Sequence, residues 1–125
     1  MRKPTQKDLS LVRRAKSLAN ASRGMWLFIK TTPNAWIQFT IFAAVVVLGI
    51  YVSLNVLEWA IIILTSAMVL AAEAFNTAIE IDIDLTSPNY HPHARDTKDV
   101  AAGAVLITAL AAGAIGICIF SKYLL

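Results

Sequence analysis

Three apolar stretches, each long enough to cross a lipid bilayer, constrain this chain more than any other feature. The first covers residues 36–54, the second starts at Trp59 and runs into an acidic segment, and the third covers residues 100–120. A transmembrane helix needs about 20 mainly apolar residues, because it rises 1.5 Å per residue through a hydrocarbon core of about 30 Å. Since 58% of the 125 residues are hydrophobic, we predict a small all-α membrane domain with three transmembrane helices. Three helices bury little protein surface alone, so we also expect an oligomer.

The segment before the first span is basic. Residues 9–30 follow a helical pattern with apolar residues on one stripe and Lys or Arg on much of the remainder. A basic amphipathic helix that carries Trp26 and Phe28 is typical of the membrane interface, although an ordinary helix packed on protein is an alternative. Pro33 ends the pattern and marks the turn into the bilayer. We therefore predict a basic tail and interfacial helix over residues 1–35 and a transmembrane domain over residues 36–125.

The two connections between the spans differ in length. Residues 55–58 are predicted to form a very short turn, so the first two spans run antiparallel. Residues 85–97 are predicted to form a polar loop, in which His91 and His93 are surface residues unless they bind a metal. The third span is rich in Ala and Gly, which allow helices to approach closely.

The distribution of charge predicts the orientation. Eight of the eleven Lys and Arg residues precede the first span, none lies in the short turn, and Arg95 and Lys98 lie near the second loop. The positive-inside rule therefore places the N-terminus and the 85–97 loop in the cytoplasm. We expect a multi-pass protein of the plasma (inner) membrane whose polar residues near this loop face the cytosol.

The second span ends in an acidic segment that a membrane helix normally avoids. On a helix, four polar side chains lie within about 60° of Glu73: Asn76, Thr77, Glu80 and Asp84. Asp82 projects roughly opposite. Measured from Trp59, Glu73 lies about 21 Å along the helix, inside the bilayer, and Glu80 about 31 Å, at the far interface. We call these five residues the polar stripe. A charge at mid-membrane costs about 2.5–3.5 kcal/mol on insertion scales, so the polar stripe favours a functional site over a protonated glutamate bonded to a neighbouring helix.

A second polar group stands at the start of the third span. Asp96 or Thr97 is expected to be the N-cap of this helix, which would place Lys98 at the positive end of the helix dipole. Carboxylates, an amide and a lysine at one membrane depth suit a Mg²⁺–nucleotide site, because Mg²⁺ takes oxygen ligands and lysine offsets phosphate charge. No GxxxxGK[ST] phosphate loop is present, so these charges alone indicate only a phosphate site.

Three motifs carry a more specific pattern: Glu73-x-x-Asn76-Thr77-Ala78-Ile79-Glu80-x-x-x-Asp84, then Ser87-Pro88-x-Tyr90-His91-Pro92, then Lys98-Asp99-Val100-Ala101-Ala102-Gly103-Ala104-Val105. Together, from about Gly24 to the C-terminus, the chain resembles the small prokaryotic membrane lipid kinases, the diacylglycerol kinase and undecaprenol kinase family. The resemblance implies a homotrimer with active sites at subunit contacts near the cytosolic membrane surface. It also implies transfer of the ATP γ-phosphate to a lipid hydroxyl. The second and third motifs look more like the undecaprenol type.

The resemblance also implies roles for single residues. Glu73 corresponds to the catalytic base and Glu80 to a Mg²⁺ ligand in the ATP site. Asn76, Lys98 and Asp99 correspond to further ATP-site residues, and Asp84 matches another acid of the family. The expected partners are therefore ATP, Mg²⁺ and a membrane lipid, with no nucleic acid.

One position departs from the family pattern. The family has a glutamate eight residues after the glycine that corresponds to Gly24, and this chain has Thr32 there, followed by Pro33. A threonine at the metal position offers a neutral hydroxyl but no negative charge. Two alternatives to the kinase stay open, and only the first of them rests on this departure. One is a non-catalytic or weakly active relative that keeps the fold and binds lipid or a partner, and the other is a small transporter or proton-relay protein that uses Glu73.

Overall fold

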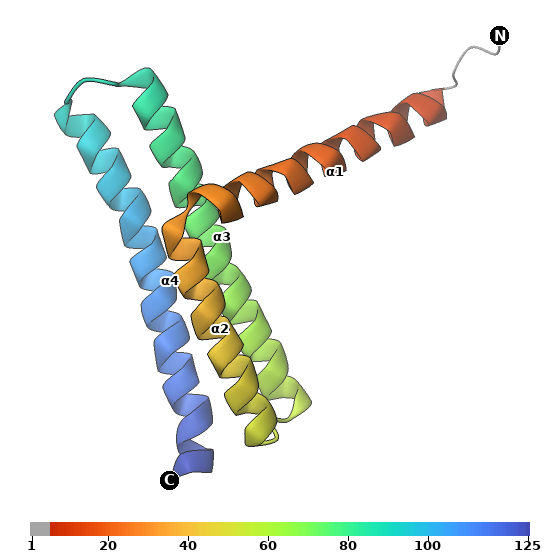
Figure 1. Ribbon diagram of the computed structural model, residues 1–125, viewed down its shortest axis with the longest axis vertical. Helices are drawn as coiled ribbons and strands as arrows, with labels where there is room; N and C mark the ends of the chain where they lie inside the picture. The colour runs from red at the N-terminus through yellow and green to blue at the C-terminus, as the bar shows by residue number, and fades with distance from the viewer. Residues whose placement is uncertain (1–5) are drawn as a thin grey trace. The chain divides into compact units, whose positions relative to one another are not determined.

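The computed structural model describes residues 6–125, with side chains from Ser10 onward, and four helices account for nearly all of this part (Figure 1). They are α1 (Gln6–Thr31), α2 (Pro33–Tyr51), α3 (Val56–Thr86) and α4 (Pro92–Leu124). Helices α2, α3 and α4 are long and apolar enough to cross a membrane. The all-α class is therefore confirmed, and three helices are able to span a membrane, as predicted.

The chain divides into two units, one ending at Pro33 and the other Asn34–Leu125. The N-terminal unit holds α1, which starts before and ends one residue after the predicted residues 9–30. Residues 1–5 of the predicted basic tail lie outside the described part. Side chains 10–27 of α1, including Leu18 and Trp26, are exposed. The position of α1 in the membrane interface stays a prediction.

The turn between α2 and α3 lies earlier than predicted. Residues 55–58 are not the turn, because Asn55 is the N-cap of α3 and Glu58 lies in its first turn. The Asn55 side-chain oxygen accepts a hydrogen bond from the Glu58 N–H at 3.0 Å, and Glu58 Oε2 accepts one from the Asn55 N–H at 2.9 Å. This reciprocal capping box satisfies two N–H groups that an uncapped helix would leave unpaired. The second span therefore starts at Val56, before Trp59.

The loop between α3 and α4 is shorter than the predicted residues 85–97. Helix α3 continues to Thr86 and α4 begins at Pro92, so only residues 87–91 lie outside a helix. His91 is the N-cap of α4 and its Nδ1 accepts a hydrogen bond from the His93 N–H at 3.2 Å. Proline suits the first helical position, because an N–H there has no partner within the helix and proline has no N–H. The expected N-caps Asp96 and Thr97 are therefore wrong, and Lys98 lies in the second turn of α4, not at its positive end.

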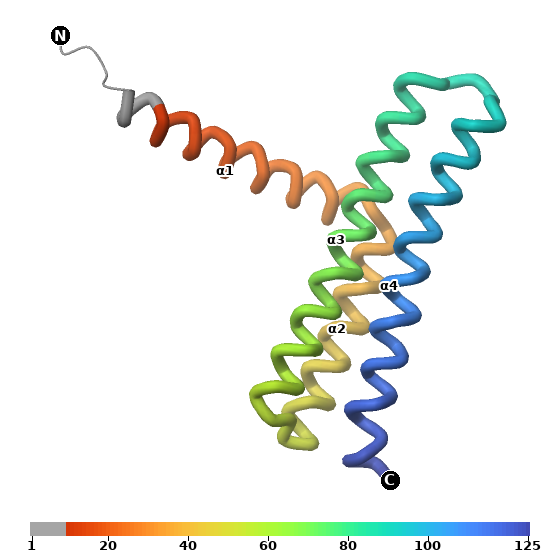
Figure 2. The backbone as a smooth tube through the Cα atoms, turned by 180° about the vertical axis from the view of Figure 1, so that it is seen from behind, coloured from red at the N-terminus to blue at the C-terminus, as the bar shows by residue number. Residues whose placement is uncertain are grey.

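Within the C-terminal unit, α3 and α4 lie side by side and antiparallel (Figures 1 and 2). Four residues form the core near the α2–α3 turn: Leu54, Ile62, Ile119 and Phe120. Gly49 on α2 adjoins this core, and a Cβ there would lie 2.8 Å from Cη2 of Trp59. The glycine therefore lets the indole ring pack directly on the α2 backbone.

A polar contact joins α3 and α4 at the same end of the unit. Glu58 Oε2 accepts a hydrogen bond from the Tyr123 hydroxyl at 2.6 Å, and Glu58 Oε1 forms an ion pair with Lys122. Glu58 is buried. A buried carboxylate is tolerated when hydrogen bonds and an opposite charge compensate for lost hydration, as they do here. We call this the turn end of the unit, and the end at residues 87–91 the loop end.

Candidate functional site

The predicted polar stripe runs along α3 toward the loop end. Glu73, deepest in the stripe, is 2% exposed, and Asn76 is 7% exposed. Glu80 is exposed, and the Asp84 side chain has 70% of its surface accessible. From Glu73 to Asp84 the helix advances about 16 Å at 1.5 Å per residue. The stripe thus connects a buried carboxylate to the protein surface.

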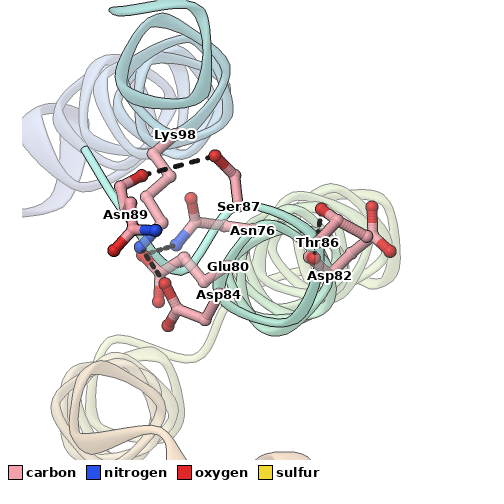
Figure 3. Close-up of polar contacts among 8 residues, drawn as sticks. All are labelled: Asn76, Glu80, Asp82, Asp84, Thr86, Ser87, Asn89 and Lys98. Atoms are coloured by element: carbon pink, nitrogen blue, oxygen red, sulfur yellow. Dashed lines mark hydrogen bonds and ion pairs between the residues drawn. The ribbon is translucent and has the colours of Figure 1, made fainter. Parts of the chain in front are cut away.

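The Asn76 side chain links the middle of this stripe. Its Nδ2 donates a hydrogen bond to Glu80 Oε1 at 3.1 Å (Figure 3). Because the NH₂ group faces the carboxylate, the amide oxygen is turned away from it. This Oδ1 atom is buried and has no hydrogen-bond partner in the described chain. An unpaired buried acceptor costs about 1–3 kcal/mol, so Oδ1 marks a place where a donor or cation from a ligand fits.

Lys98 approaches the exposed end of the stripe from α4. Its Nζ lies 2.5 Å from Asp84 Oδ1, in a contact between residues 14 positions apart (Figure 3). Asp82 and Thr86 lie on the other side of α3, where Thr86 Oγ1 donates to the Asp82 backbone oxygen at 2.8 Å (Figure 3). The predicted separation of Asp82 from the stripe is therefore confirmed.

A pocket of about 300 Å³ opens at the loop end. Its polar lining comes from the end of α3, the loop and the start of α4, and includes Asp84, Asn89, His91, Arg95, Lys98 and Asp99. Arg95 and Asp99 form an ion pair at 3.6 Å. We did not predict Arg95 or Asn89 as site residues. Once α4 is known to begin at Pro92, the spacing of Arg95, Lys98 and Asp99 places all three near one face of the helix.

A second pocket, of about 450 Å³, lies between α2, α3 and α4. Its lining is mainly apolar and includes Phe42 and Val69, with Thr65 and Ser66 among its few polar members. Val69 lies one helical turn from Glu73 and is buried on the same side of α3. Glu73, the deepest residue of the stripe, therefore lies one helical turn from a residue that lines the apolar pocket.

The metal-site predictions concern the two histidines of the loop end and the polar stripe. Among the described side chains, from Ser10 onward, no group of three or more His, Cys, Asp or Glu residues could hold a metal ion. His91 caps α4 and His93 pairs with Asp96 at 3.7 Å, so the alternative metal site at the two histidines is not formed. Asn76 Oδ1 and Glu80 are oxygen donors that suit Mg²⁺, which commonly takes one or two protein ligands and completes its shell with phosphate and water.

Thr32, the predicted replacement for the family glutamate, lies in the N-terminal unit. It is the residue between α1 and α2, it is buried, and its N–H donates to the Phe28 backbone oxygen at 3.0 Å. Its part in metal binding stays a prediction.

Comparisons with known proteins cover most of the chain. A family model described as "Prokaryotic diacylglycerol kinase" matches residues 19–120. An undecaprenol kinase of Bacillus subtilis (strain 168) is 39% identical over 105 residues, which cover 84% of this chain and 85% of that protein. A diacylglycerol kinase of Helicobacter pylori (strain ATCC 700392 / 26695) is 28% identical over 80% of this chain and 84% of its own. A diacylglycerol kinase of Synechocystis is 41% identical over 66% of this chain and 47% of its own. No solved structure matches significantly.

Proposed function

The chain belongs to the prokaryotic diacylglycerol kinase family, and from this premise we propose that it transfers the γ-phosphate of ATP to the hydroxyl of a membrane lipid. The observation that carries the proposal is the stripe on α3. One helix face joins buried Glu73, beside an apolar pocket, to Asp84, which contacts Lys98 at the protein surface. A lipid alcohol suits the first environment and a phosphate donor the second, and one helix face carries both.

Glu73 is the proposed general base. The lipid chain lies in the apolar pocket, and its hydroxyl donates a hydrogen bond to the Glu73 carboxylate. Glu73 takes the hydroxyl proton as the lipid oxygen bonds to the γ-phosphorus, and the bond from that phosphorus to the bridging oxygen of ADP breaks. A positioned base of this kind contributes about 10²–10⁴ in rate.

Residues of α4 and two residues of the stripe act on the phosphates. Lys98, with Arg95 nearby in the same pocket, offsets phosphate charge. Asn76 Oδ1 and Glu80 are the proposed Mg²⁺ ligands, and the bond from Asn76 Nδ2 fixes the Glu80 carboxylate in position. Bound Mg²⁺ would neutralise part of the charge that develops on the phosphates.

We propose undecaprenol over diacylglycerol as the acceptor. The relative that aligns over most of both chains at 39% identity is named an undecaprenol kinase, and residues 87–92 resemble that type. The non-catalytic alternative rests on Thr32 and gains no support from the relatives, which are named kinases. Following the family resemblance, we also propose a homotrimer, and the apolar side chains exposed on the helices, such as Val47 and Leu110, would then meet lipid or neighbouring subunits.

The test is phosphate transfer by the purified protein in mixed micelles. With ATP radiolabelled at the γ-phosphate, we expect label in the extracted lipid when undecaprenol is present, less with equimolar diacylglycerol, and none after Mg²⁺ is chelated. Absence of label from both lipids, with Mg²⁺ present and the protein folded, would contradict the proposed function.

A further inference from the structure

The contact between Lys98 and Asp84 joins two helices across the loop end. Lys98 extends from the second turn of α4, and Asp84 lies near the end of α3. The side chain of Lys98 is 36% exposed, and that of Asp84 is 70% exposed. Asp99, the residue next to Lys98, is held by Arg95. The lysine proposed to bind phosphate is therefore held by a specific carboxylate of the stripe.

We propose that Asp84 is a positioning residue that holds the Lys98 ammonium at the mouth of the site. This inference rests on the proposed kinase function. Lysine has a long flexible stem, and binding a phosphate with a free lysine costs the rotamer entropy of that stem. The ammonium group has three N–H donors, so one can bond to Asp84 while two remain for phosphate oxygens. Asp84 would thus lower the entropy cost of nucleotide binding without blocking the lysine.

The exposure of the pair separates this role from a purely structural one. The Asp84 partner is largely exposed and the Lys98 side chain about one-third exposed, so solvent reaches the ion pair and its contribution to folding stability is small. Helices α3 and α4 are also joined by their short loop and by the contacts of Glu58 at the turn end. Loss of the Asp84 carboxylate should therefore change nucleotide affinity and leave folding nearly unchanged.

Asp82 supplies a matched control. It carries the same charge two residues earlier in α3, but it lies on the side away from Lys98 (Figure 3). Removal of any carboxylate near a nucleotide site lessens charge repulsion and should, by itself, strengthen ATP binding slightly. If Asp84 positions Lys98, removal of the Asp84 carboxylate should weaken ATP binding instead, because the Lys98 side chain is no longer held in place.

The experiment compares full-length wild type, Asp84→Asn, Asp84→Glu and Asp82→Asn. The KM for ATP and kcat are measured with lipid in mixed micelles, and binding of a non-hydrolysable ATP analogue is measured by calorimetry. We expect Asp84→Asn to weaken nucleotide affinity about two- to fivefold, the upper part of the range measured for exposed ion pairs, and to lower kcat less than affinity. Asp84→Glu should recover part of the loss, and Asp82→Asn should show unchanged or slightly tighter binding.

Two results would overturn the positioning role. One is tighter nucleotide binding by Asp84→Asn, which would mean that Asp84 competes with phosphate for Lys98. The other is unchanged affinity in Asp84→Asn while the wild-type protein is active. A wild-type protein that neither binds the analogue nor phosphorylates lipid would instead contradict the proposed function, and this inference with it.

Discussion

At the scale of single residues, Asn76 combines a structural cost with a proposed function. Its buried Oδ1 has no partner in the described chain, and its Nδ2 bonds to Glu80. We predict that Asn76→Leu leaves folding stability unchanged or raises it, because an apolar group of similar size removes an unsatisfied acceptor worth about 1–3 kcal/mol. Kinase activity should nevertheless fall at least about tenfold, as a lost hydrogen bond to a charged group would cause.

Thermal unfolding in detergent and the Mg²⁺ dependence of kinase activity measure the two effects. Asp82→Asn, on the other side of α3 (Figure 3), is the control and should keep the wild-type stability and Mg²⁺ dependence. An Asn76→Leu protein that loses stability but keeps full activity at low Mg²⁺ would show that Asn76 supports the fold and binds no metal.

Thr32 permits a gain-of-function prediction. If Thr32 occupies a metal-ligand position, Thr32→Glu adds the carboxylate implied by the family resemblance, and half-maximal activity should require less Mg²⁺. Thr31→Glu is the matched control, because Thr31 is adjacent but exposed, and its hydroxyl donates to the Leu27 backbone oxygen. The Mg²⁺ titration of both variants decides the matter. If both variants lower the Mg²⁺ requirement equally, or if neither lowers it, Thr32 is not part of the metal site.

At the scale of helices, the sequence predicted the elements but not their ends. The apolar runs determine that α2, α3 and α4 exist, because each run matches the thickness of a bilayer. Helix ends depend on local caps, and the Asn55–Glu58 capping box and the His91–Pro92 start were both missed. The second error misplaced Lys98 relative to the start of its helix.

Contacts within one helix could be predicted from the sequence, whereas contacts between helices could not. Helical periodicity brings Asn76 to Glu80 and Asp82 to the opposite side, since these residues belong to one helix. The bond from Tyr123 to Glu58 joins residues 65 positions apart. Such a contact depends on how α3 and α4 pack, which no local pattern in the sequence contains.

Gly49 gives a prediction about helix packing. Gly49→Ala places a methyl group 2.8 Å from the Trp59 ring, so the ring must move, and overpacking of this kind costs about 1–3 kcal/mol. The methyl group of Gly103→Ala would meet no atom within 4 Å in the described chain. This variant should be about 0.5–1 kcal/mol more stable than wild type, because alanine favours the helix more than glycine does. Unfolding by heat in the same detergent measures both. Equal stability of the two variants would contradict the close packing of α2 on Trp59.

At the scale of the whole molecule, the charge distribution predicts a cytoplasmic loop end. In a Cys118→Ala background, Asn89→Cys should resist a membrane-impermeant thiol reagent in sealed cells and react after permeabilisation. Ser53→Cys, in the turn between α2 and α3, should react from outside. The opposite labelling pattern would reverse the orientation and would place the proposed ATP site away from cytosolic ATP.

The most direct measurement is kcat for Glu73→Gln beside wild type, with radiolabelled ATP and undecaprenol at saturating concentrations. The amide keeps the shape of the buried side chain, and a neutral group is cheaper to bury than a carboxylate, so helical content and thermal stability should be retained. Because the amide cannot take the lipid proton, kcat should fall by about 10²–10⁴. Asp82→Asn, which removes a carboxylate on the other side of α3, should keep wild-type kcat. A folded Glu73→Gln protein that turns over near the wild-type rate would contradict Glu73 as the base of a lipid kinase.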